Sequence, residues 1–375
     1  MNQVLVAGHI CLDIIPAFKG KVTFDPGRLF EVGEAKISTG GAVSNTGQAL
    51  HKLGVRTSLA GKIGKDLFGK AICEVLEKNG LGLSRGMQVS ETDSSSYTVV
   101  ISLSGEDRMF LHSPGCNNTF VANDVSDSAI ADARLIHFGY PTLMARMFAD
   151  DGAELESLFR RAKELGATTS LDVSLPDLSS PAGQADWERI LKRVLPYTDL
   201  FLPSIDELLF MLDKASFAAF QGSEIPSHEF ERLSDLALDL GAKVVAVKAG
   251  ARGLYLKASS ILEGLGRGEP ENLLEWQGVE LWAPVFEVEV DGTTGAGDAT
   301  IAGLLMGWLR GMSPDLAVRA AVAVGACCCE QADAVSGVKS WEEIETRLQS
   351  EWPVRELVLP EEWSFNGTTF RKETR

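Results

Sequence analysis

The feature that most constrains the fold is an alternation of strand-like and helix-like segments that begins near Asp132. Short apolar runs stand at 135–139, 167–173, 200–203 and 243–248, and segments with helical spacing lie between them. Strands that alternate with helices indicate βαβ units, whose strands pair in parallel. We therefore predict an α/β fold with a mostly parallel central sheet. Such sheets bind ligands beyond the carboxyl ends of their strands.

A glycine-rich turn lies late in the chain, where a strand-like run over 282–290 meets an apolar helical pattern. The turn reads G-T-T-G-A-G-D and ends at Asp298. The first amides of a helix lack partners within it, and together with the positive end of the helix dipole they attract an anion. A carboxylate beside such an anion site suits phosphoryl transfer to a hydroxyl. The alternative interpretation is a turn whose aspartate only caps the helix.

The bulk properties narrow the class of protein. The chain has 375 residues and a net charge of −17, which argues against a nucleic-acid surface. It has no apolar run of about 18 residues and no basic, apolar leader, so we expect neither a membrane span nor a signal peptide. Three of its six cysteines are consecutive within an apolar helical pattern, and its five histidines show no metal-ligand spacing. We expect a cytosolic protein with reduced cysteines.

The amino-terminal part offers groups that suit a polyol. A strand-like run over 3–15 carries Asp13 at its end, and Gly40-Gly41 then breaks the chain before a helical segment that contains Asn45. Short carboxylate and amide side chains, with close approach of the backbone, are what hydroxyl groups require. An aspartate at a strand end is also a common turn residue.

Two motifs resemble those of the ribokinase-like (PfkB-type) carbohydrate kinases and stand in the same order: G-G-x-x-x-N near the start of the chain and G-T-T-G-A-G-D near its end. The resemblance covers roughly residues 1–350 as one kinase domain. It implies a three-layer α/β/α fold with a small β-sheet lid from about 13–38 and 94–112. Asp298 would be the general base, and the phosphoryl group would be held by Gly295, Ala296 and Gly297. The sugar site would comprise Asp13, Gly40, Gly41, Asn45 and, from the lid, Arg108.

The same resemblance extends to the nucleotide. The segment V-A-V-K-A-G-A-R-G is similar to the family's nucleotide-side turn, and P-S-I-D-E is similar to its magnesium motif. Nucleotide contacts are implied at Lys248, Gly250, Gly253 and Thr294, and a metal contact is implied at Glu207. The chain departs from the family pattern at Cys11 and Ser204, where asparagine is usual, and at Gly292, where an acidic residue is usual.

One further motif is rejected, and one segment has no predicted role. G-K-D-L-F-G-K-A, from Gly64 to Ala71, is one residue short of a Walker A loop, but Ala71 lacks the hydroxyl that binds Mg²⁺ and the loop residues are bulky. Residues 351–375 form a carboxyl-terminal extension beyond the resemblance.

We predict an ATP-dependent, Mg²⁺-dependent kinase that phosphorylates a primary hydroxyl of a small sugar or related polyol. Dependence on a monovalent cation such as K⁺ and a homodimer formed through the lid stay open. Two alternatives also stay open: a nucleoside kinase on the same fold, and a sugar-binding regulator that has lost catalysis.

Overall fold

The computed structural model describes residues 2–18, 26–102 and 109–372. Most of its strands form one large sheet in the order β15-β16-β14-β13-β12-β11-β10-β9-β1-β4. Six neighbouring strands pair in parallel: β12 (Val244–Lys248), β11 (Leu200–Phe201), β10 (Thr168–Asp172), β9 (Ala133–Gly139), β1 (Asn2–Gly8) and β4 (Thr57–Ala60). The antiparallel strands are β13 (Leu254–Ala258), β14 (Glu280–Ala283), β15 (Trp363–Phe365) and β16 (Phe370–Lys372). The predicted mostly parallel sheet is confirmed.

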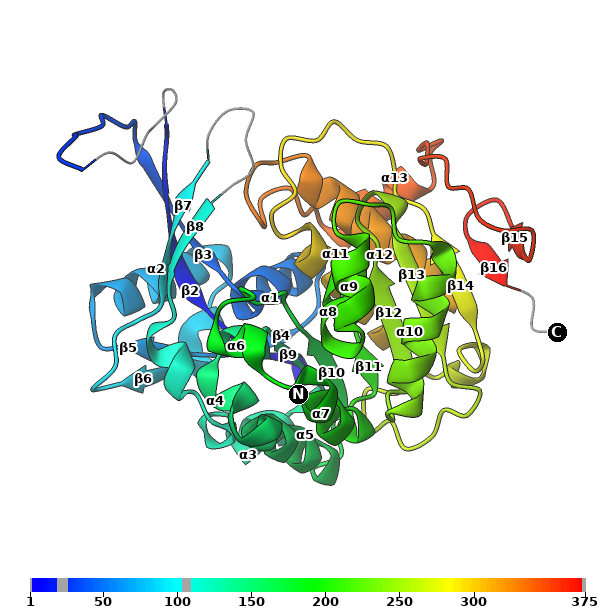
Figure 1. Ribbon diagram of the computed structural model, residues 1–375, viewed down its shortest axis with the longest axis horizontal. Coiled ribbons are helices and arrows are strands. Elements are labelled where there is room, and N and C mark those ends of the chain that lie inside the picture. Colours follow the sequence, from blue (N-terminus) through cyan, green and yellow to red (C-terminus); the bar gives the residue numbers. More distant parts are fainter. Residues whose placement is uncertain (1, 19–25, 103–108, 373–375) are drawn as a thin grey trace.

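Helices cover both faces of this sheet (Figure 1). Successive residues of β1 alternate between two apolar cores: Val4 and Val6 belong to one, and Leu5 and Ala7 belong to the other. Full burial of a valine or leucine side chain contributes roughly 1.5–3 kcal/mol. The first core includes α1 (Ala42–Lys52), α11 (Ala296–Leu309), α12 (Pro314–Cys329) and α13 (Trp341–Leu348). The second includes α5 (Ala153–Glu164), α7 (Trp187–Val194), α8 (Ile205–Leu212) and α10 (Ser227–Asp239). This confirms the three layers.

The remaining elements are shorter or peripheral. The helices are α2 (Leu67–Asn79), α3 (Asp127–Ala131), α4 (Ala145–Phe148), α6 (Pro181–Gln184) and α9 (Lys214–Phe220), and β5 (Lys62–Gly64) pairs with β6 (Gln88–Ser90). Asp66 caps α2 by accepting a hydrogen bond from the Gly69 amide, so the sequence that is nearly a Walker A loop is an ordinary helix start. No helix of the described residues has both the length and the apolar character needed to cross a membrane.

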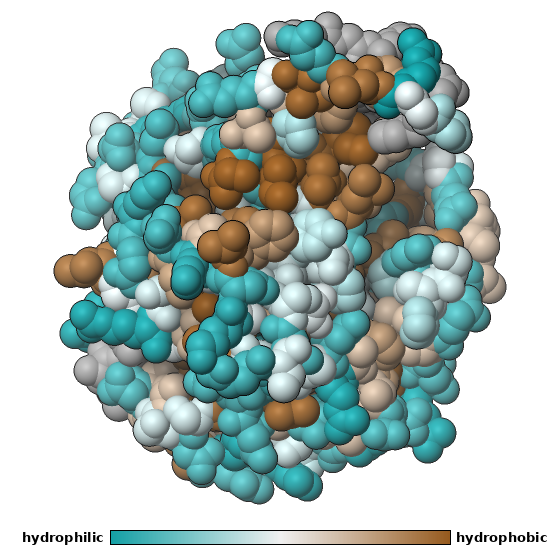
Figure 2. All heavy atoms as spheres, turned by 90° about the vertical axis from the view of Figure 1, so that its left-hand side faces the viewer, coloured by the Kyte–Doolittle hydropathy of each residue, from teal (hydrophilic) through white to brown (hydrophobic). Residues whose placement is uncertain are grey.

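A second, four-stranded sheet stands beside the main one, and we call it the small sheet. Its order is β3 (Ala35–Gly40), β2 (Cys11–Pro16), β7 (Tyr97–Ile101) and β8 (Met109–Ser113). The pairing of β7 with β8 is antiparallel, as predicted for a hairpin. Its turn and Arg108 lie outside the described residues. Apolar side chains gather on the face of the molecule that carries this sheet (Figure 2), and they include the exposed Ile37, Phe110 and Leu111.

Two strand predictions were wrong in their extent. The run over 3–15 is not one strand, because the chain leaves the main sheet after Gly8, whose φ is 126°. Asp13 therefore lies in the middle of β2 in the small sheet and not at the end of a core strand. The run over 282–290 is a strand only to Ala283, because Pro284 has no amide to donate to a ladder.

Candidate active site

The start of α11 meets α1 at the carboxylate of Asp298, which is 3% exposed. Asn45 Nδ2 donates to its Oδ2 at 3.0 Å, and Thr46 Oγ1 donates to its Oδ1 at 3.0 Å. The hydroxyl of Tyr140 donates to Oδ2 at 2.8 Å. Three donors from two distant parts of the chain therefore fix the orientation of this carboxylate. Sequence reasoning identified Asp298 and Asn45 but missed Thr46 and Tyr140.

Tyr140 follows β9 in a backbone conformation that is rare for a residue with a side chain. Its φ is 64°, in the left-handed region, and strained residues of this kind often mark functional sites. Burial raises the pKa of its hydroxyl well above the usual value, and the nearby Asp298 raises it further. Tyr140 is therefore a neutral donor to Asp298.

The glycine-rich turn adopts the conformation that its composition predicts. Gly295 has a φ of 75°, and a Cβ there would lie 2.5 Å from the carbonyl oxygen of Ala334. No side chain in the described chain caps α11. The amide of Ala296 donates to the carbonyl of Thr293 at 3.2 Å, whereas the amides of Gly297 and Asp298 have no partner among the described residues and remain available to a ligand. Gly295, Ala296 and Gly297 all line a cavity of about 1040 Å³. The arrangement can bind an anion at the position where the sequence predicted one.

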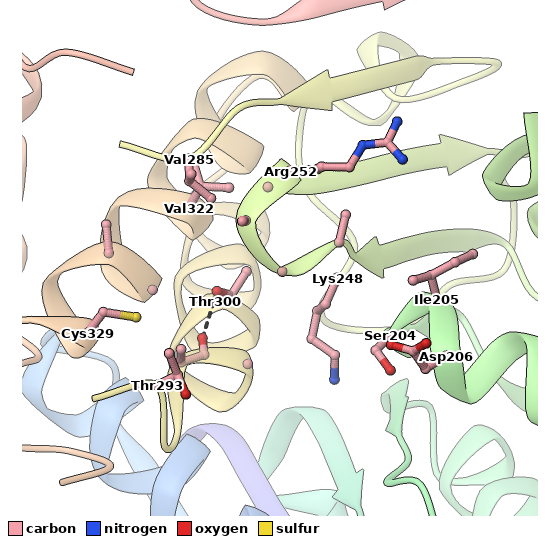
Figure 3. A pocket seen from close by; sticks show the side chains of 18 of the residues that line it. Ser204, Ile205, Asp206, Lys248, Arg252, Val285, Thr293, Thr300, Val322 and Cys329 are labelled. Carbon is pink, nitrogen blue, oxygen red and sulfur yellow. Dashed lines mark hydrogen bonds between the residues drawn. The ribbon is translucent and has the colours of Figure 1, made fainter. Parts of the chain in front are cut away.

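Lys248, at the end of β12, points into the same cavity (Figure 3). It lies between the buried carboxylate of Asp172 and the carboxylate of Glu207, whose side chain is 12% exposed. Its Nζ is 2.6 Å from Asp172 Oδ1 and 3.9 Å from Glu207 Oε2. Burial alone would lower the pKa of Lys248, but the two carboxylates outweigh it and raise the pKa. Burial raises the pKa of Asp172, and the ammonium group opposes that shift. Asp172 ends a predicted strand, yet its partnership with Lys248 was not foreseen.

Glu207 also serves the local fold. In a capping box at the start of α8, Ser204 N donates to Glu207 Oε2 at 2.6 Å, and Glu207 N donates to Ser204 Oγ at 3.3 Å. The side chain lines the cavity nevertheless. Asp172 Oδ2 is buried without a partner in the described residues. Two carboxylates beside one ammonium leave an excess negative charge, so this corner fits a magnesium ion, which favours oxygen ligands.

On the other side of Asp298, Asp13 lies against Gly40. A Cβ on Gly40 would be 2.4 Å from Asp13 Oδ2, so only glycine allows this close packing. Burial raises the pKa of Asp13 to about 6, although hydrogen bonds from Cys11 and Thr98 lower it. The Cys11 thiol donates to Asp13 Oδ1 at 3.3 Å. Cys11 thus interacts with the predicted sugar-binding carboxylate directly.

His9 is a buried group that sequence reasoning did not single out. It is 2% exposed, neither ring nitrogen has a partner in the described chain, and burial lowers its pKa to about 3. Its ring lies 5.3 Å from that of His112 and 6.3 Å from that of Tyr140. Gly41, with a φ of 87°, leaves room for it, since a Cβ would lie 2.5 Å from His9 Nδ1. His9 is therefore a neutral polar group beside Asp298's donor Tyr140.

His9, Cys11 and His112 place one ligand atom each within 4.8 Å of one another, close enough to hold a metal ion. The linear spacing of the histidines gave no sign of this, because His9 and Cys11 are two residues apart and His112 reaches them from β8.

Of the four residues predicted to contact the nucleotide, Lys248, Gly250 and Gly253 line the cavity and Thr294 does not. Gly250 and Gly253 have φ values of 55° and 95° and line the cavity with Lys248. Thr294 is not among the lining residues; Thr293 is, and the carbonyl of Thr294 accepts a hydrogen bond from Cys328 Sγ at 3.6 Å. The departure at Gly292 is accommodated by the backbone, because the amides of Asp291 and Gly292 both donate to the carbonyl of Cys329.

The chain matches the family model described as "pfkB family carbohydrate kinase" over residues 1–341. It therefore belongs to the PfkB family of carbohydrate kinases.

Among its relatives is an uncharacterized sugar kinase from Archaeoglobus fulgidus, 26% identical, covering 77% of this chain and 97% of the relative. A 2-dehydro-3-deoxygluconokinase from Bacillus subtilis is 25% identical over 88% of this chain and 92% of its own. The structure of Arabidopsis thaliana ribokinase, complexed with ribose and ATP, is 19% identical and covers 93% of this chain and 99% of its own, with a TM-score of 0.71. At that identity the last likeness shows the ribokinase fold.

Proposed function

We propose that this protein transfers the γ-phosphoryl group of ATP to a primary hydroxyl of a small sugar or related polyol. The observation that carries the proposal is the position of Asp298. Its carboxylate lies in the first turn of α11, next to the glycine turn, lines the same cavity and accepts hydrogen bonds from Asn45 and Tyr140. A base in that place can take the proton of a hydroxyl that attacks a phosphoryl group held by the amides.

Each of these residues has a separate role in the proposed phosphoryl transfer. Asp298 accepts the hydroxyl proton, and its three donors keep one carboxylate oxygen aimed at the acceptor. The amides of Gly295, Ala296 and Gly297 hold the phosphoryl oxygens as negative charge develops. Lys248 adds a positive charge beside the turn, because its side chain lies within 4 Å of the place where a Cβ on Gly297 would stand. Mg²⁺ held near Glu207 and Asp172 would offset the remaining charge of the phosphates.

The acceptor sugar is proposed to bind at Asp13, Gly40, Gly41 and Asn45. Asn45 Oδ1 is buried without a partner in the described residues, as are both ring nitrogens of His9. Buried polar groups without partners are costly, and sugar hydroxyls would satisfy them. Because burial lowers the pKa of His9 to about 3 and raises that of Asp13, the described residues here suit neutral hydroxyls.

The test is ADP release from Mg-ATP with a panel of sugars, sugar acids and nucleosides, run in potassium and in sodium buffer. Asp298→Asn is measured in parallel. We expect one acceptor class to give turnover, and the variant to lose about three or more orders of magnitude in kcat while sugar binding persists. Turnover of the variant within tenfold of wild type would refute the base. Sugars that raise the melting temperature without any turnover would instead indicate a binding protein.

We infer also that the small sheet serves as a lid and as the contact surface of a homodimer. Both faces of β8 are open, because the consecutive residues Met109, Phe110 and Leu111 are 42%, 58% and 57% exposed. Consecutive strand residues point to opposite faces, so one side can close over the sugar while the other meets a second copy. Phe110→Asp should convert a dimer to a monomer in light scattering, whereas a wild-type monomer at micromolar concentration would overturn the dimer.

A further inference from the structure

The carboxyl-terminal extension, which lies beyond the family match, runs along one wall of the cavity. The amide of Glu287 donates to the carbonyl of Pro353, and the amide of Arg355 donates to the carbonyl of Val285, each at 2.8 Å. Phe286 and Val354 form an antiparallel bridge between them. This pairing takes the place of the predicted strand beyond Ala283. It brings Arg355 to the cavity wall.

Aromatic packing fixes this part of the extension. The ring of Trp352 stacks on that of Phe286 with centroids 4.2 Å apart, and its Nε1 donates to the carbonyl of Glu287 at 3.0 Å. The guanidinium of Arg347, in the last turn of α13, lies 3.7 Å from the ring centroid of Trp352. Trp352 is 9% exposed. The backbone at 352–355 is therefore held in place before any ligand binds.

A second anchor follows further along the extension. Strand β16 pairs with β14, and its residues reach Asp315 on α12. Thr369 Oγ1 donates to Asp315 Oδ1 at 2.5 Å, and Arg371 pairs with Oδ2 at 2.7 Å. With anchors on both sides, the segment 353–358 crosses the cavity edge as a strap.

Arg355 lies within this strap and is exposed. Its side chain lines the cavity and has no hydrogen bond or ion pair with any described residue. The other two lining cations are engaged: Lys248 pairs with Asp172, and Arg252 donates to the carbonyl of Ile225 at 2.6 Å and stacks on Trp282. In Figure 3 Arg252 points away from Lys248. Arg355 is thus the cation in the described cavity wall that is free to meet a ligand.

The position of Arg355 indicates which part of a nucleotide it would meet. The phosphate-binding turn and Lys248 lie at one end of the cavity, and Val285 and Val322 lie at the other (Figure 3). The apolar end suits a planar base. Because its amide bonds to Val285, Arg355 starts at that apolar end. A guanidinium stacks on aromatic faces and donates to ring nitrogens and oxygens, which a lysine ammonium cannot do in the same way.

We propose that the extension supplies Arg355 as a contact to the base and ribose of the nucleotide. The proposal rests on the proposed function to the extent that the cavity binds ATP. It makes the extension part of the nucleotide site, a role for which neither the family motifs nor the composition of 351–375 gave a sign.

The test is the affinity of the full-length protein for Mg-ADP and Mg-ATP, measured by titration calorimetry without sugar. Arg355→Ala and Arg355→Lys should each bind both nucleotides about tenfold more weakly than wild type, at 50 mM and 300 mM salt alike. Glu356→Ala is the matched control: it is the next residue on the strap, it is exposed and it does not line the cavity. Its affinity should equal that of wild type.

Three outcomes would overturn the proposal. Arg355→Ala with wild-type affinity would show that the side chain makes no contact. Rescue by Arg355→Lys, with a steep salt dependence, would show attraction to phosphates in place of contact with the base. An equal loss in Glu356→Ala would show a general disturbance of the strap. Because binding is measured without turnover, a failure to find an acceptor sugar would leave this result interpretable.

Discussion

The two ends of the site, on either side of Asp298, are built in different ways. The end that we propose to bind phosphate, called the phosphate end, is largely one continuous turn and the first turn of α11, joined by Lys248 at the end of β12. The end that we propose to bind the sugar, called the sugar end, is formed by the β1–β2 connection, the Gly40-Gly41 turn, α1 and the residue after β9. One end is therefore a property of a short sequence, and the other is a property of the tertiary fold.

The two ends also differ in how their polar groups are satisfied. At the phosphate end, Lys248 Nζ already pairs with Asp172 Oδ1 at 2.6 Å, although Asp172 Oδ2 is buried without a partner in the described residues. At the sugar end, His9 and Asn45 Oδ1 are buried without partners in the described chain. An unsatisfied buried group costs about 1–3 kcal/mol. Damage to the phosphate end should therefore reduce stability, whereas damage to the sugar end should mainly reduce substrate affinity.

The largest effect is expected for Lys248→Met, which removes the ion pair between Lys248 and Asp172 at the phosphate end. It leaves Asp172 and Glu207 buried without their cation, and removal of one partner of a buried pair costs about 3–5 kcal/mol of unfolding free energy. Urea denaturation measures this loss. Addition of Asp172→Asn should recover part of it. Lys65→Met, which breaks an exposed pair with Glu91, is the control and should change stability by under about 1 kcal/mol.

A smaller effect, confined to sugar binding, is expected for Asp13→Asn. We expect the sugar KM to rise about 100-fold with the ATP KM unchanged, because hydrogen bonds to a charged acceptor contribute roughly 1.5–3 kcal/mol. The pKa of Asp13 is raised by burial to about 6. In wild type the sugar KM should therefore rise as pH falls through about 6, and in the variant it should not.

The pH dependence of stability gives an independent check on the raised pKa of Asp13. The groups around this carboxylate are Cys11, which donates to it, Thr98, which donates to Cys11, and His112, which is hydrogen-bonded to Thr98. A carboxyl with a raised pKa in the folded state stabilises the fold while protonated, and this contribution is lost as pH rises from about 4 through about 6. Asp13→Asn should thus be more stable than wild type at pH 8 and similar at pH 4. Equal stability at both pH values would mean that Asp13 is not desolvated in solution.

This contrast explains what the sequence could predict. The glycine turn, Asp298 and the helix starts depend on neighbours along the chain, so local spacing was sufficient. Asp13 was identified, but its location was wrong, because a single glycine with positive φ moves the chain from one sheet to the other. Tyr140, with its left-handed backbone, and the pairing of Asp172 with Lys248 arise only when strand ends meet, and no spacing rule records that.

A third prediction tests the residue that joins the two ends, Tyr140. Tyr140→Phe removes one donor from Asp298 without changing the ring, and we expect kcat to fall about tenfold with both KM values nearly unchanged. Thr46→Val removes the donor to the other oxygen and should have a similar effect. Tyr197→Phe, at a partly buried tyrosine that packs against the second core, is the control. A change in KM in place of kcat would make Tyr140 a sugar contact and not a positioning residue.

The smallest expected effect concerns the link between the small sheet and the phosphate end. Lys36 Nζ on β3 lies 2.5 Å from Asp333 Oδ2, in the loop whose Ala334 packs behind Gly295. Lys36 is 57% exposed, so the pair should contribute under about 1 kcal/mol. Lys36→Ala should raise the sugar KM about twofold at low salt, and the difference should vanish at 500 mM salt because screening weakens exposed pairs. Lys65→Ala controls for the loss of a surface charge. If the twofold effect persists at high salt, the lysine stem and not its charge positions the small sheet, and the two ends are then coupled through packing.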